Sequence, residues 1–178
     1  MTSADDEQRG LELLREAGDA IVAGVERELP GWVERSVERI IDAWGRTPAE
    51  ARESAMRDAV VAGRVATDRI TAELRALFAL DPDDQRSTPL ELVRGAYREP
   101  TAVLAALGIP AVERDDFAER AWPDDVYGLV VHGLGDLGDR GDLGGLGEPG
   151  DPGDEELAPY QLAWGMAKAK VLRARRSG

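Results

Sequence analysis

The densest group of side chains that could do chemistry in this 178-residue chain is acidic. Residues 113–132 hold closely spaced carboxylates and the only histidine, His132. The carboxylates of interest are Asp115, Asp116, Glu119, Asp124 and Asp125. Carboxylate oxygens and imidazole are ligands for Mg²⁺, Mn²⁺ or iron. Metal sites in helical bundles usually use Glu-x-x-His pairs, which this chain lacks. We therefore expect these residues to cap a helix and face solvent, with metal binding as the alternative.

Two arginines that precede this acidic cluster could belong to the same alternative binding site. Arg94 and Arg98 are one helical turn apart, so they could clamp an anion, or they could pair with Glu91 or Glu99. Residues 94–125 would then line the pocket of a small-molecule-binding or metal-binding helical enzyme.

The motifs of common enzyme classes are missing from the sequence. The serines lie outside G-x-S-x-G and S-x-x-K patterns, there is no cysteine, and no Walker A or dinucleotide fingerprint is present. We therefore expect a non-catalytic protein that needs no cofactor.

Two further charged groups could contact a macromolecule. Glu34, Glu38 and Asp42 step by four residues and form an acidic stripe for a basic partner, or a solvated face. The C-terminal tail carries the cations Lys168, Lys170, Arg173, Arg175 and Arg176. The tail could touch nucleic acid, but a net charge of −13 opposes this, so we expect it to face the chain's own carboxylates.

The elements that must position these residues are predicted to be helices. Apolar residues recur at helical spacing over 6–29 and 33–44, with a break at Pro30 and an end at Gly45. Thr47, Pro48 and Glu50 predict a capping box that opens a long third helix reaching Leu80. Its heptad-like seam consists of Met56, Val60, Gly63, Thr67, Ile70, Leu74 and Leu77. Gly63 indicates either a break in this helix or a close crossing with another.

Shorter helices are predicted downstream. Thr88 and Glu91 form a second capping box, which opens a helix over 89–99 that ends before Pro100. Further helices are expected over 101–107, 115–121 and 157–175, the last with Trp164, Ala167 and Val171 on its apolar side. The sequence thus predicts an all-α bundle of five to six helices.

Glycine occupies every third position over residues 135–155, and aspartate usually follows it. Proline is too scarce here for a collagen triple helix, and calcium binding is expected to be weak at most. We expect 133–155 to be a disordered acidic linker between a helical body, 1–132, and a basic amphipathic helix, 156–178, that packs back on it within one domain.

Together these features favour a small, acidic, cytoplasmic protein-interaction or adaptor module. The start of the chain does not resemble a signal peptide, and no apolar run is long enough to span a membrane. We expect an unidentified protein partner, no membrane or nucleic-acid binding, and self-association through the 56–77 seam.

Overall fold

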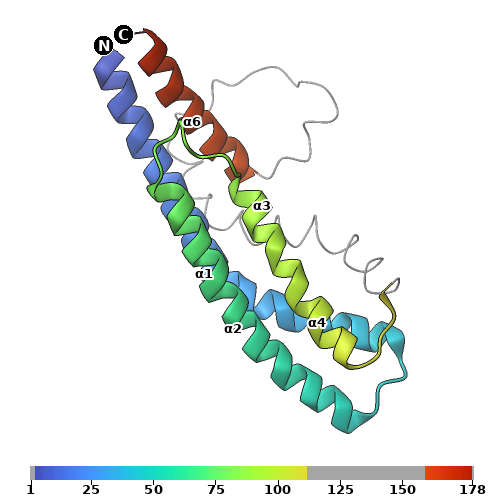
Figure 1. Ribbon diagram of the computed structural model, residues 1–178. Helices are drawn as coiled ribbons and strands as arrows, with labels where there is room; N and C mark the ends of the chain where they lie inside the picture. Colours follow the sequence, from blue (N-terminus) through green and yellow to red (C-terminus); the bar gives the residue numbers. More distant parts are fainter. Residues whose placement is uncertain (1–2, 112–158, 178) are drawn as a thin grey trace.

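The computed structural model describes residues 3–111 and 159–177, and these ranges fold as helices without strands (Figure 1). The elements in chain order are α1 (Ser3–Trp44), α2 (Ala49–Ala79), α3 (Pro89–Arg94), the 3₁₀ turn η1 (Gly95–Tyr97), α4 (Arg98–Ala106) and α6 (Pro159–Ser177). The all-α class is confirmed for this part of the chain. The helix predicted over 115–121, the glycine triplets and the linker 133–155 lie outside the described residues.

Pro30 does not divide the first helical region. It lies inside α1, which continues unbroken to Trp44, so the prediction of separate helices over 6–29 and 33–44 is wrong. A proline inside a helix costs about 3 kcal/mol or more. Here Leu29 and Val33, both fully buried, lie in the turns around Pro30 and hold the helix in the core. The long helix α2 is consequently the second helix of the chain and not the third, so the predicted order of helices is wrong.

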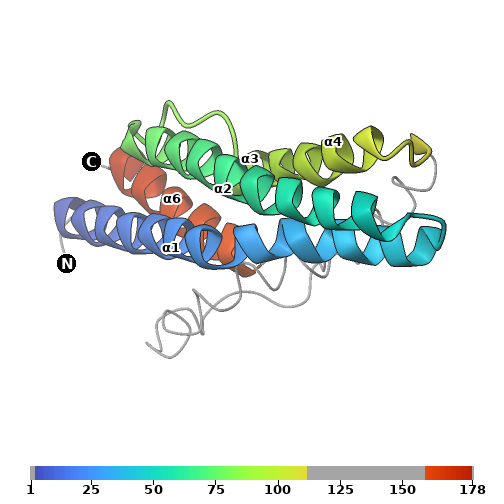
Figure 2. The ribbon, with the colours of Figure 1, turned by 90° about the horizontal axis from the view of Figure 1, so that it is seen from below.

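α2 returns antiparallel along α1, and the two helices form the body of the bundle (Figures 1 and 2). They approach most closely where Gly63 faces Pro30. A Cβ atom on Gly63 would lie 2.9 Å from the carbonyl oxygen of Pro30 and 3.1 Å from its Cα. Gly63 therefore marks a close helix crossing rather than a break, and α2 runs through it without interruption.

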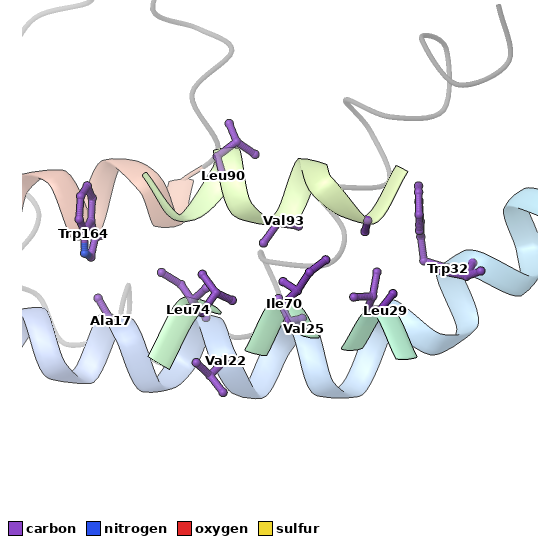
Figure 3. Packing of buried hydrophobic residues seen from close by; sticks show 14 of the residues in the cluster. Ala17, Val22, Val25, Leu29, Trp32, Ile70, Leu74, Leu90, Val93 and Trp164 are labelled. Carbon is purple, nitrogen blue, oxygen red and sulfur yellow. The ribbon is translucent and has the colours of Figure 1, made fainter. Parts of the chain in front are cut away.

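The remaining helices cover one side of the α1–α2 pair. Figure 3 shows Val93 of α3 pointing toward Ile70 and Leu74 of α2, and Trp164 of α6 lying over Ala17 of α1. Leu90 of α3 belongs to the same buried cluster. A second cluster packs Val37 and Ile41 of α1 against Val103, Leu104 and Ile109. The predicted apolar stripes are thus largely in the core. On α6, the buried residues are Trp164, Ala167 and Val171. Five of the seven residues of the 56–77 seam are also buried, namely Gly63, Thr67, Ile70, Leu74 and Leu77.

The helix ends follow the sequence signals unevenly. Gly45 ends α1 with φ +65°, in the left-handed region that favours glycine. The Thr88 hydroxyl accepts from Glu91 N at 3.4 Å, and Glu91 Oε2 accepts from Thr88 N at 2.8 Å, so this capping box is confirmed. The box predicted at Thr47 is wrong, because α2 begins at Ala49 with Pro48 in the cap position and no side-chain cap bond.

Two boundaries differ from the prediction near Pro100 and at the last helix. Pro100 lies in the first turn of α4. Backbone N–H groups in the first turn of a helix have no acceptor within the helix, so the N–H that proline lacks costs no hydrogen bond there. The regular helix that began at Pro89 is interrupted earlier, by η1. α6 spans Pro159–Ser177, two residues later at each end than predicted.

Candidate functional site

The face of the α1–α2 pair away from α3 and α6 is hollowed. A groove of about 500 Å³ runs between the N-terminal half of α1 and the C-terminal end of α2. Val22 marks its floor: Figure 3 shows this side chain pointing away from the core residues of α3 and α6. The lining residues come from α1, from the end of α2 and from the loop after it, and no other described helix contributes to the groove.

Apolar and charged side chains both line the groove. The small and apolar residues are Leu11, Leu14, Gly18, Val22, Ala23, Phe78, Ala79, Leu80 and Pro82. Leu80 is 48% exposed and is the most exposed large apolar side chain of the lining. Phe78 lies flat over Gly18, where a Cβ atom would be 3.0 Å from two ring carbons. Because Gly18 has no side chain, the ring of Phe78 packs directly against the backbone of α1.

Charged side chains of both signs form the rim. Arg75 of α2 pairs with Glu26 of α1 across one end of the groove. Arg15 and Asp19 lie between Leu11 and Glu26 along α1, and neither has an ion pair with another described residue. A lining that combines apolar side chains with unpaired charges suits a ligand that is itself amphipathic.

The predicted acidic stripe is occupied by the chain's own arginine. Arg52 of α2 donates to Glu38 at 3.1 Å and also to Asp42, while Glu34 is half-buried one turn earlier. The hydrogen bond with Asp42, followed by the charges of Asp42 and Glu38, raises the pKa of Arg52. The stripe therefore serves as a tie between α1 and α2.

The predicted arginine pair lies on the surface of the described part of the chain. Arg94 and Arg98 are exposed, and neither pairs with another described residue. The two glutamates considered for them are engaged elsewhere: Glu91 caps α3, and Glu99 accepts from Arg69 at 2.8 Å. The other members of this candidate site, Asp115, Asp116, Glu119, Asp124 and Asp125, lie outside the described residues. The part of the chain that is described holds no group of three or more acidic or histidine side chains arranged for a metal ion.

Some cations of the basic tail contact other parts of the chain, and others are exposed. Lys168 Nζ donates to the carbonyl of Gln85 at 2.6 Å and lies 5.0 Å from the centre of the Trp164 ring. Burial, together with the charge of Arg86, lowers the pKa of Lys168. Lys170 is half-buried, and Arg173 and Arg176 are exposed.

Arg175 is the most connected cation of the tail. It donates to Glu7 at 2.8 Å, to Asp81 at 2.7 Å and to Asp83 at 2.6 Å. Its hydrogen bonds lower the pKa of Asp81 to about 2 and raise the pKa of Arg175 itself. The tail thus locks α6 to the start of α1 and to the loop after α2, side by side at one end of the bundle (Figure 1).

The comparisons with known proteins give no family. Neither the protein-family models, nor the curated proteins, nor the solved structures contain a match to this chain. Among the described helices, none is long and apolar enough to cross a membrane.

The groove itself was not predicted from the sequence. The pattern places Leu11 and Leu14 on the apolar stripe of α1, but it does not show that both also line a groove beside α2. The available signals were Gly18 beside that stripe and Leu80, an apolar residue beyond the last seam position.

Proposed function

We propose that this protein is a non-catalytic interaction module that binds an amphipathic helix of a partner protein in the α1–α2 groove. The observation that carries the proposal is the groove between two antiparallel helices, where Ala23, Phe78 and Leu80 reach the surface between charged side chains. A third helix packs naturally into the groove between two others, because its side-chain ridges fit between theirs.

The rim defines the chemistry of the partner. Apolar residues at positions i, i+3 or i+4, and i+7 of the incoming helix would cover Val22 and Phe78. Arg15 and Asp19 favour an acidic and a basic residue on the flanks of that helix, since both charges lack a partner among the described residues. Charges of this kind at a rim contribute orientation and association rate more than affinity.

Selection of helical peptides from a displayed library against the full chain tests the proposal. We expect the selected peptides to share the apolar spacing above and to bind with measurable fluorescence anisotropy. Ala23→Arg, which places a long cation on the groove floor, should weaken binding at least about tenfold, equivalent to 1.4 kcal/mol.

Ala43→Arg is the matched control, because Ala43 is also exposed on α1 but lies outside the groove. It should leave peptide affinity unchanged. Equal loss in both variants, or peptides without helical spacing, would contradict the proposal. A small-molecule or metal-ion thermal shift that Ala23→Arg leaves intact and Arg94→Ala removes would favour the enzyme alternative instead.

A further inference from the structure

The two walls of the groove are tied together at both ends by arginines. At one end the tie is the ion pair of Glu26 with Arg75, and both residues belong to the lining itself. At the opposite end the tie comes from Arg175 of α6, a helix that contributes none of the lining residues. The shape of this end therefore depends on an element outside the groove.

Arg175 contacts both walls at this end. On the α1 wall it donates to Glu7 at 2.8 Å, and Glu7 lies about one helical turn before Leu11 of the lining. On the opposite wall it donates to both carboxylate oxygens of Asp81, at 2.7 and 3.0 Å. Asp81 directly precedes Pro82, which also lines the groove. A single guanidinium thus fixes how far apart the two walls are.

The geometry of this contact makes it stronger than an ordinary surface ion pair. Isolated exposed pairs contribute little to stability, whereas bidentate pairs and networks contribute more. The side chain of Arg175 is only 28% exposed, its fork-like contact with Asp81 is bidentate, and it also donates to Asp83 at 2.6 Å. Loss of this one side chain would leave the loop wall without its ionic connection to α1.

The loop after α2 has a second connection to α6. Lys168 donates to the backbone carbonyl of Gln85 at 2.6 Å. Gln85 is buried, and its side-chain amide donates to the carbonyl of Leu80 at 3.2 Å. Leu80 of the lining is therefore connected to α6 through one buried residue.

The apolar packing of α6 is modest. Among residues 163–177, the buried apolar side chains are Trp164, Ala167, Val171 and Ala174, so two of the four are alanines. Because alanine buries little apolar area, the contacts of Arg175 and Lys168 form a substantial part of what holds α6 in place. An element held in this way is displaced at a smaller cost than α1 or α2.

We propose that α6 regulates the groove, with Arg175 and Lys168 as positioning residues that hold the loop wall against α1, a regulation that rests on the proposed function of the groove. When α6 is docked, the end of the groove at Leu11 and Pro82 has a fixed width. When α6 is displaced, this wall is released and binding of a partner helix weakens. Such linkage is reciprocal, so a helix bound in the groove also stabilises the docking of α6.

Amide hydrogen exchange of the full chain, followed by NMR, tests the positioning role without a ligand. The Leu80 amide donates to Leu77 at 3.2 Å and the Asp84 amide donates to the backbone of Asp81 at 2.8 Å. Arg175→Gln should accelerate exchange of these two amides at least about fivefold, because the loop loses its tie to α1. Arg176→Gln, which removes the adjacent exposed cation, should leave both rates within about twofold of the wild type.

The link to binding is measured with the helical peptides selected for the groove. Arg175→Gln and Lys168→Met should each weaken peptide affinity at least about fivefold. Gly63→Ala, which destabilises the fold outside the groove lining, should leave affinity within about twofold. Peptide binding to the wild type should also slow exchange of the amides around Val171, although α6 contributes none of the lining residues.

The outcomes separate this regulation from the function of the groove. A wild type that binds no helical peptide would overturn the proposed function, while exchange at Leu80 and Asp84 would still decide whether Arg175 positions the loop. Regulation by α6 would be overturned by unchanged exchange in Arg175→Gln, by a loss of affinity that Gly63→Ala reproduces, or by α6 exchange that the peptide does not slow.

Discussion

At the scale of single residues, Arg175 has the densest set of ionic contacts in the tail. It joins Glu7 of α1 and the aspartates of the loop after α2 through hydrogen bonds of 2.6–2.8 Å. Since Asp81 has a pKa of about 2 in the folded chain against an ordinary 3.8, its contribution to stability is present above about pH 4. The contribution is lost as the pH falls through 2.

Arg175→Gln should therefore lower the melting temperature at pH 7. The difference from the wild type should shrink steadily below pH 4, because protonated Asp81 gains nothing from the arginine. Thermal unfolding followed by circular dichroism across pH 2–7 measures this. Arg176→Gln is the control, because Arg176 is the adjacent cation and is exposed. A pH-independent difference between Arg175→Gln and the wild type would show that packing, not charge, is lost.

Gly63 provides a second test at this scale. Gly63→Ala should destabilise the fold by about 1–3 kcal/mol, because its Cβ atom would meet the backbone carbonyl of Pro30 at 2.9 Å. Gly165→Ala in α6, where a Cβ atom meets nothing within 4 Å, should instead stabilise by about 0.5–1 kcal/mol. Urea unfolding of both variants gives the comparison. If both stabilise equally, α1 and α2 do not cross closely at this point.

At the scale of elements, two similar sequence signals have different outcomes. Thr47-Pro-Ala-Glu and Thr88-Pro-Leu-Glu both have the spacing of a capping box, but only Thr88 and Glu91 bond reciprocally. Thr88→Ala should cost about 1 kcal/mol of stability, whereas Thr47→Ala should cost little because no cap bond is lost. Chemical denaturation of the two variants distinguishes them. An equal loss would mean that both threonines cap their helices.

The elements also show what local pattern can predict. Apolar spacing identified the buried sides of α1, α2 and α6, because a helix in a bundle must bury one stripe. It failed at Pro30, where the local cost of proline is outweighed by buried neighbours and by the space that Gly63 leaves. That compensation comes from a residue on another helix, which no local pattern contains.

At the scale of the whole molecule, the predicted charged sites and the proposed groove have different origins. Glu38, Asp42 and Arg175 were recognised from sequence spacing, and the structure gives each an internal ionic partner. The groove depends on which side of the α1–α2 pair is covered by α3 and α6 (Figure 2). Coverage is a property of the assembled bundle, so the sequence did not predict the groove.

The central claim is that the groove binds a partner helix. Site-specific photo-crosslinking in the native cell tests it most directly, with the photoreactive residue at Leu80 in the groove or at Val61 outside it. We expect a discrete cross-linked protein from Leu80 that disappears when Ala23→Arg is introduced and is not obtained from Val61. The same species from both positions, or a Leu80 product that survives Ala23→Arg, would contradict it.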